Sequence, residues 1–189
     1  FPRGSNDDWP VLASQFPVGS TPQTVVLAYD EDFAIQYFRR NLRPYWNRRE
    51  VGASEMIRNA VDQAPNLRTQ AAQFDAKLRK DAEAVGGPEY AQLLALAYRQ
   101  CLAGHGLVED ERDGLLMFSK ENSSNGCMAT VDVIFPASPF FLYYSPRLLR
   151  AQLDPVLAYS ESPRWKFPFA PHDLGTYPLA NGQVYGGGE

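Results

Sequence analysis

The chain has 189 residues, of which 44% are hydrophobic and 13% aromatic, and its formal net charge is −4. This length suits a single domain, and the abundance of Phe, Tyr and Trp excludes an intrinsically disordered chain. The acidic balance argues against a nucleic-acid partner, and the absence of any run of about 18 apolar residues argues against a membrane span.

The two ends of the sequence indicate that it was cut from a longer protein. Pro2-Arg3-Gly4-Ser5 reads like the remnant of a protease-cleavable expression tag. The other end falls within a polar, glycine-rich stretch, Gly186–Glu189. We therefore expect residues 1–5 to be a tag remnant and residues 6–189 to be part of a domain excised from a larger protein.

A first helix is predicted from Thr21 to about Asn41. Thr21 is a good N-cap, and Pro22 suits the first helical position, where its missing N–H costs nothing. Pro44 disfavours helical backbone at the residue before it. Asp30 would lie inside this helix, where a carboxylate is stable only when it is paired or faces a cavity. The segment is apolar on two sides, which predicts a buried helix; its stripes are Val26, Tyr29, Phe33 and Tyr37, and Leu27, Ala34 and Phe38.

Three further helices are predicted before residue 104. They span Ser54–Gln63, Leu67–Val85 and Pro88–Ala103. Gly86-Gly87 ends the second helix and Pro88 begins the third, as is common at helix termini. The tight link between them predicts an antiparallel αα-hairpin.

The segment Gly104–Gly126 is predicted to be a long connection. Asp113-Gly114 is a turn signal between two apolar runs, Leu107–Val108 and Leu115–Phe118. The sequence therefore predicts a small β-hairpin at this point in the chain.

The apolar segment Ala129–Tyr144 is interpreted as a buried helix, although its β-branched run Val131–Ile134 leaves a strand open. A last helix is predicted from Ser145, as N-cap, to about Tyr159. From Ser160 onward Pro, Gly and aromatic residues dominate. The chain is therefore predicted to be mainly α, with a long irregular C-terminal loop region.

The two cysteines, Cys101 and Cys127, are compatible with one disulfide or with two buried thiols, and the residues leave this open. Neither lies in a CxxC pair. The only histidines, His105 and His172, are far apart in the sequence. Such a set is poor for a metal, so neither a metal site nor a cofactor is expected.

Several stretches together resemble the glutaminase A family in their order and spacing. The longest runs from Phe167 to Glu189 and contains the sequence HDLGTYPLANGQVYGGG. The others are Leu27–Asp30, Leu42–Trp46, Phe118–Asn122 with Ser124–Gly126, and Val131–Pro139.

The resemblance implies a secreted, multidomain, extracellular protein that hydrolyses L-glutamine to L-glutamate and ammonia. It also implies that residues 6–189 are a partial six-hairpin domain, with helical hairpins that form part of an (α/α)6-barrel-like toroid. The remaining domains of the parent chain would then be partners, and hairpin faces left exposed would favour self-association. The resemblance brings no catalytic residue set with it.

Among the residues themselves, His172 and Asp173 are the first candidates for chemistry, because they lie in an aromatic loop. Asp173 is predicted to be a catalytic acid/base or to bind a substrate ammonium, with His172 orienting it. The structural alternative is that Asp173 caps a turn while His172 packs on aromatic rings. Neighbouring residues in the chain do not face one another automatically.

The stretch Asn181–Glu189 offers a second set of candidates. Asn181 and the glycine N–H groups are suited to a substrate carboxylate or a tetrahedral oxyanion. Glu189 is predicted to be a second catalytic carboxylate in the intact protein. The structural alternative for this stretch is a flexible loop.

Substrate binding is also predicted for Lys120, Glu121 and Asp30. Lys120 and Glu121 would hold the α-carboxylate and α-ammonium of glutamine, or else form an exposed ion pair. Asp30 and Asp132 lie in apolar sequence, where burial suits a general acid but where a structural role is the stronger interpretation. Asn122 begins an N-glycosylation sequon, and a glycan there would exclude a buried substrate contact.

Two other functions fit the same residues. Aromatic residues such as Trp46, Trp165 and Tyr185 also suit a glycoside hydrolase that uses two carboxylates about 5–9 Å apart. The chain is alternatively a folded fragment or binding module without catalytic activity, which an exposed apolar face would support.

Overall fold

The computed structural model describes residues 13–17, 19 and 24–187. The predicted cap at Thr21 and Pro22, the tag remnant at residues 1–5 and the carboxylate of Glu189 lie outside these residues. Within the described part, no helix is long and apolar enough to cross a membrane.

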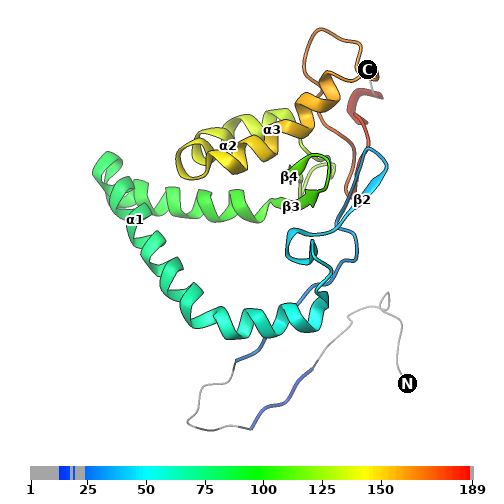
Figure 1. Ribbon diagram of the computed structural model, residues 1–189. Coiled ribbons are helices and arrows are strands. Elements are labelled where there is room, and N and C mark those ends of the chain that lie inside the picture. The colour runs from blue at the N-terminus through cyan, green and yellow to red at the C-terminus, as the bar shows by residue number, and fades with distance from the viewer. Residues whose placement is uncertain (1–12, 18, 20–23, 188–189) are drawn as a thin grey trace.

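Three α-helices and two small β-sheets make up the described part of the chain (Figure 1). The helices are α1 (Gly52–Ala103), α2 (Val131–Tyr144) and α3 (Pro146–Ser160). The antiparallel strands β3 (His105–Asp110) and β4 (Gly114–Ser119) form one sheet. The other sheet has the order β2-β1-β5 and contains β1 (Ile35–Tyr37), β2 (Arg40–Leu42) and β5 (Leu179–Ala180). Two short 3-10 helices lie at Tyr45–Asn47 and Tyr185–Gly187.

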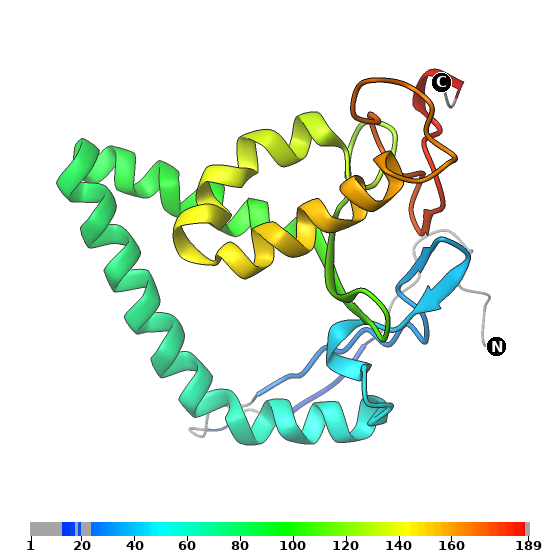
Figure 2. The ribbon, with the colours of Figure 1, turned by 45° about the horizontal axis from the view of Figure 1, so that its top comes forward.

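The expected mainly α fold, with helical hairpins in part of an (α/α)6 toroid, is wrong for this chain. Three helices do not close a ring, and the two arms of α1 spread apart from their corner instead of packing along their length (Figure 2). The apolar side chains on α1 explain this, because most of them face solvent. Leu67, Val85 and Leu93 are 50%, 81% and 64% exposed, and within α1 only Leu78, Ala82 and Ala91 are buried.

The predicted helix from Thr21 to Asn41 is also wrong where it is described. Residues 24–34 have no regular secondary structure, and β1 and β2 follow in register from Ile35↔Leu42 to Tyr37↔Arg40. The turn between them has positive φ at both Phe38 (45°) and Arg39 (65°), as a two-residue hairpin turn requires. Asp30 is therefore exposed in an irregular segment and is not buried in a helix.

The three helices predicted between Ser54 and Ala103 exist as helical backbone, but they belong to one element. Helix α1 keeps helical backbone through Pro65 and leaves it only at Gly87, where φ is 79° and ψ is −178°. The Gly-Pro boundary was therefore predicted correctly. The antiparallel hairpin was not, because the two arms diverge from the corner (Figure 2), although Phe74 and Tyr98 still contact each other across them, with 5.2 Å between ring centroids.

The structure confirms the predicted β-hairpin and the last two predicted helices. Strands β3 and β4 pair from His105↔Ser119 to Asp110↔Gly114, with Gly114 at a φ of 74°. Helix α2 forms where a strand was the alternative, although only Ile134 and Phe141 are buried in it. Ser145 is the N-cap residue of α3, without a side-chain capping hydrogen bond.

The irregular C-terminal segment, also predicted, contributes directly to the core. Trp165, Leu174 and Ala180 from this segment pack into the main cluster of buried residues. The other members come from β1 to β4, from the segment after β4 and from α2 and α3: Ile35, Tyr37, Leu42, Val108, Leu116, Phe118, Met128, Ala129, Ile134, Val156 and Tyr159. The chain after residue 160 is therefore part of the fold. Cys101 and Cys127 are both free thiols.

Candidate functional site

The candidate site forms where the C-terminal segment runs beside the segment that follows β4. Backbone hydrogen bonds join the two segments: Leu174 N–H donates to Met128 O (2.9 Å), Met128 N–H to Gly175 O (2.8 Å) and Val131 N–H to His172 O (2.9 Å). These bonds bring His172 and Asp173 to the N-terminal end of α2.

Asp173 is completely buried, and its carboxylate is surrounded by donors. Oδ1 accepts the backbone N–H groups of Gly175 (2.8 Å) and Val184 (3.1 Å), while Oδ2 accepts that of Tyr185 (3.2 Å). A carboxylate held in this way fixes the course of the chain from 172 to 185. The structural alternative for Asp173, a turn cap, is therefore present in the structure.

Asp173 also holds the imidazole of His172. His172 Nδ1 lies 3.0 Å from Asp173 Oδ2, and the side chain of His172 is 30% exposed. The ring stacks on Tyr185, with 4.4 Å between centroids and 26° between planes. With Nδ1 bonded to a carboxylate, Nε2 is the ring nitrogen left for chemistry.

Glu121 and Asp132 approach the same imidazole. One carboxylate oxygen of each and one nitrogen of His172 all lie within 4.8 Å of one another. Glu121 Oε1 accepts the hydroxyl of Thr130 (2.9 Å), and Oε2 accepts that of Ser124. Asp132 lies in the first turn of α2 and is exposed.

Cys127 completes the group from the buried side. Its sulfur, a His172 nitrogen and an Asp173 oxygen also lie within 4.8 Å of one another. Burial, together with the Asp173 and Glu121 carboxylates, raises the pKa of the Cys127 thiol to about 11. The thiol is therefore protonated at neutral pH and is not a nucleophile. We call Glu121, Cys127, Asp132, His172 and Asp173 the carboxylate–imidazole cluster.

Sequence reasoning did not find this cluster as a unit. It selected Glu121, His172 and Asp173, but it favoured a structural role for Asp132 and treated Cys127 only as a thiol. The clue was that Asp132 stands at the start of a predicted helix, where its side chain projects from the N-terminal end. No pattern in the local sequence, however, indicates that residues 128–131 pair with residues 172–175.

Two predicted substrate contacts lie in other surroundings. Asn181 Nδ2 donates to Gln36 Oε1 (2.7 Å), and Asn181 Oδ1 accepts the backbone N–H of Arg39 (2.7 Å). Asn181 thus stabilises the β1–β2 turn through its side-chain hydrogen bonds. Lys120 Nζ lies over the ring of Tyr177, 3.8 Å from its centroid, and is therefore held apart from the contacts of Glu121.

Lys120 lines a small pocket of about 200 Å³ together with Asn122 and Tyr177. The side chain of Asn122 is exposed, as a glycan would require. The Tyr177 hydroxyl donates to Glu31, at 3.1 and 3.3 Å from its two carboxylate oxygens. Asp30 forms no hydrogen bond or ion pair with another described residue.

Of the aromatic residues proposed as sugar platforms, Trp165 is buried, and its indole N–H donates to Phe169 O (2.5 Å). Tyr185 is occupied by its stack on His172. The glycoside alternative therefore loses two of its three proposed platforms, Trp165 and Tyr185, to contacts within the fold.

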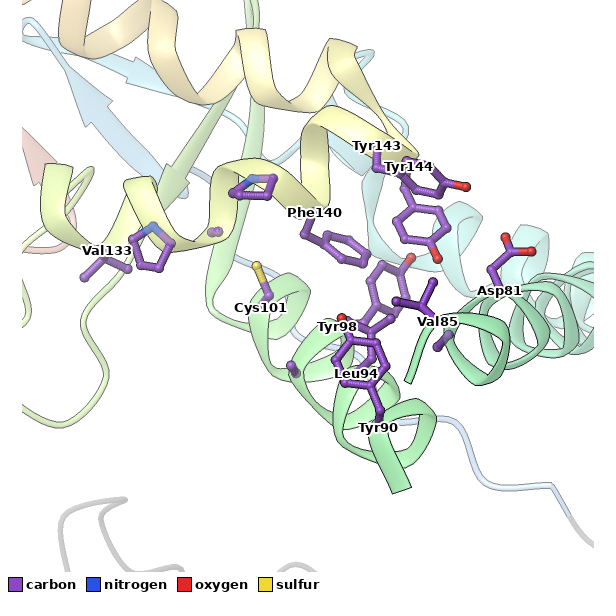
Figure 3. A pocket seen from close by; sticks show the side chains of 15 residues that line it. Asp81, Val85, Tyr90, Leu94, Tyr98, Cys101, Val133, Phe140, Tyr143 and Tyr144 are labelled. Atoms are coloured by element: carbon purple, nitrogen blue, oxygen red, sulfur yellow. The ribbon is translucent and has the colours of Figure 1, made fainter. Parts of the chain in front are cut away.

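An apolar groove of about 650 Å³ lies between α2 and the two arms of α1 (Figure 3). Its aromatic rings point into one space from both helices; they are Tyr90, Tyr98, Phe140, Tyr143 and Tyr144. The self-association predicted from the sequence would use this surface, and it stays a prediction.

Comparison with known proteins shows two matching family models. Residues 87–189 match the glutaminase A six helical-hairpin domain, and residues 1–81 match a domain of unknown function, DUF5127. The glutaminase A of Aspergillus oryzae is 32% identical over 200 aligned residues, which cover 99% of this chain and 28% of that protein. A probable glutaminase of Arthroderma benhamiae is 31% identical over 158 residues, covering 82% of this chain and 18% of that protein.

No solved structure matches. The chain spans less than a third of the length of these curated relatives. The six-hairpin model nevertheless covers more than half of the chain, and the alignment to the Aspergillus protein covers nearly all of it. The chain belongs to the glutaminase A family.

Proposed function

We propose that this chain supplies hydrolytic residues of a glutaminase, which converts L-glutamine and water to L-glutamate and ammonia. The observation that carries the proposal is the alignment of nearly the whole chain with a protein named glutaminase A. The carboxylate–imidazole cluster supports it, because amide hydrolysis needs groups that activate water and move protons.

The open side of the cluster, formed by Glu121, Asp132 and His172, is where water is activated. The activated water adds to the side-chain amide carbon of glutamine, its proton is passed to the amide nitrogen, the C–N bond breaks, and ammonia leaves. Asp173 is buried and does not reach a substrate, so its role in this proposal is to position His172. Lys120, next to an open pocket, remains a proposed partner for a substrate carboxylate.

The experiment measures ammonia release from L-glutamine by this chain and by its intact parent protein. We expect the Asp132→Asn and Glu121→Gln variants of the active protein to lose about 10²–10⁴-fold in kcat, because each removes a group that activates water. The matched controls are Asp62→Asn and Glu83→Gln, which change exposed carboxylates on α1.

Loss in the cluster variants with activity retained in the controls supports the proposal. No ammonia from either protein, or full activity in both cluster variants, contradicts it. Activity in the parent alone places part of the active site in the rest of the parent protein.

We also propose that the parent protein is extracellular and carries a glycan on Asn122, which is exposed in a sequon. Mass spectrometry of this peptide from the secreted fraction tests the proposal, and an unmodified asparagine in that fraction contradicts the glycan.

A further inference from the structure

The open side of the cluster brings together three side chains of the kinds that bind metal ions. An oxygen of Glu121, an oxygen of Asp132 and a nitrogen of His172 lie within 4.8 Å of one another. Ligand atoms around a tetrahedral zinc ion, with bonds of about 2.0–2.2 Å, lie about 3.4 Å apart. Asp132 is exposed, so its side chain is free to rotate toward the other two ligand atoms.

The imidazole is already held in the way that metal-binding histidines usually are. Such a histidine commonly donates its second ring N–H to a carboxylate, which fixes the tautomer and the ring orientation. Here Nδ1 faces the buried Asp173, and stacking on Tyr185 limits ring rotation further. Nε2 is therefore the nitrogen available to a cation.

Glu121 is held in a similar way. The hydroxyls of Thr130 and Ser124 each donate to one of its carboxylate oxygens, which leaves a lone pair on each oxygen for another partner. Thr130 is completely buried, so this contact is fixed by the core.

The charges of the cluster point to a cation independently of its geometry. Three carboxylates converge there, and within the described residues no Lys or Arg lies within ion-pair distance of any of them. The Cys127 thiol lies on the buried side of the imidazole, near Asp173, and is not one of the three ligands. An imidazole beside two carboxylates suits a transition-metal ion better than Mg²⁺ or Ca²⁺, which prefer oxygen alone.

We propose that Glu121, Asp132 and His172 bind one divalent transition-metal ion of the Zn²⁺ class, with Asp173 and Thr130 holding two of these ligands in place. Three protein ligands leave one coordination position for water. Where the proposed glutaminase function holds, that water is the nucleophile, because a bound zinc ion makes water acidic enough to ionise near neutral pH. The other histidine, His105, takes no part, since both its ring nitrogens have partners in the core.

The test uses the 189-residue chain, stripped with a chelator and then titrated with Zn²⁺ in a calorimeter, with Mn²⁺, Mg²⁺ and Ca²⁺ for comparison. We expect one Zn²⁺ per chain, and a melting temperature that rises with Zn²⁺ concentration as ligand binding to the folded state requires. Asp132→Asn and Glu121→Gln should each weaken Zn²⁺ binding at least about 10-fold. Asp62→Asn and Glu83→Gln should leave it unchanged.

Because Asp132 is exposed, Asp132→Asn should fold normally, and circular dichroism checks this. Equal Zn²⁺ binding in wild-type and cluster variants overturns the proposal, as does no binding by the wild-type chain. The readout is metal binding and not turnover. Zn²⁺ binding without ammonia release from the parent therefore contradicts the glutaminase function alone, and ammonia release by a protein that binds no metal contradicts the metal site alone.

Discussion

Four donors converge on the carboxylate of Asp173: three backbone N–H groups and the imidazole of His172. At the residue scale this is the contact on which the site depends, because it fixes both the course of the 172–185 segment and the orientation of the ring. The sequence indicates that His172 and Asp173 are chemically important. It does not show which of them contacts a substrate, because that depends on burial by residues far away in the chain.

We predict that Asp173→Asn destabilises the chain by about 2–4 kcal/mol, because an amide NH2 group would face backbone N–H donors inside the protein. Urea unfolding of the isolated chain measures this. The control, Asp62→Asn, changes an exposed carboxylate on α1 and should shift stability by less than about 0.5 kcal/mol. Equal stability of the two variants would show that Asp173 is not the organising contact.

The same reasoning explains why Asn181 and Lys120 were predicted as substrate contacts. Each is a polar residue in a predicted loop, and the sequence contains no sign of its neighbours in the fold, which are the Tyr177 ring for Lys120 and the β1–β2 turn for Asn181. Asn181 is bound to Gln36 and Arg39, which lie 145 and 142 positions away in the chain. Contacts of that separation follow from the fold and cannot be inferred from the local sequence.

At the scale of elements, predictions succeeded where the signal is local. The Asp113-Gly114 turn specifies the β3–β4 hairpin, and the Gly-Pro pair marks the bend of α1 at Gly87. The predicted helix at residues 21–41 is wrong, because strand pairing outweighed the intrinsic helix propensity of this segment. Strand β1 pairs with β2 and, in parallel, with β5, through Gln36↔Leu179 and Tyr37↔Ala180.

The connection that precedes β5 depends on Gly175. Its φ is 133°, and a Cβ added there would lie 2.0 Å from Leu179 O. We predict that Gly175→Ala destabilises the chain by about 3 kcal/mol or more, through backbone strain combined with this overlap. Gly114→Ala is the matched control, because its φ of 74° is strained but no atom lies within 4 Å of the added Cβ.

Denaturant midpoints of the two glycine variants, compared with wild type, measure the difference. Gly114→Ala should cost about 1–2 kcal/mol from strain alone. A Gly175→Ala variant no less stable than Gly114→Ala would mean that the connection shifts to accept the methyl group.

At the scale of the whole molecule, the toroid implied by family resemblance does not appear, although membership of the family is confirmed. The core instead unites the small sheets, parts of α2 and α3, and the C-terminal segment. Helix α1 contributes its C-terminal end, through Cys101 and Leu102, to a second apolar cluster. Composition predicted that a core exists, but the pairing of distant segments decides which residues form it.

One partly buried histidine connects three of these elements through its hydrogen bonds. His105, at the start of β3, has Nδ1 2.5 Å from Cys101 O in α1 and Nε2 2.7 Å from Gln152 Nε2 in α3. The carbonyl accepts the Nδ1 proton, so Nε2 must accept from the Gln152 amide, and the ring is neutral. Burial lowers the pKa of His105 below its ordinary value of 6.5, partly offset by the hydrogen bond to Cys101.

A histidine whose pKa is lowered in the folded state makes the unfolded state bind more protons in mild acid. The stability of the chain should therefore be complete above about pH 6.5 and fall below it, by at most about 1.4 kcal/mol per pH unit. Urea unfolding between about pH 5 and 7.5 measures this range before most carboxylates titrate. The slope should persist in His172→Gln, because His105 is then the only remaining histidine. The prediction is wrong if the free energy of unfolding of that variant does not change with pH over this range. It is also wrong if NMR shows that His105 titrates at or above pH 6.5, because protonation of the ring would then not oppose the packing of α1, β3 and α3.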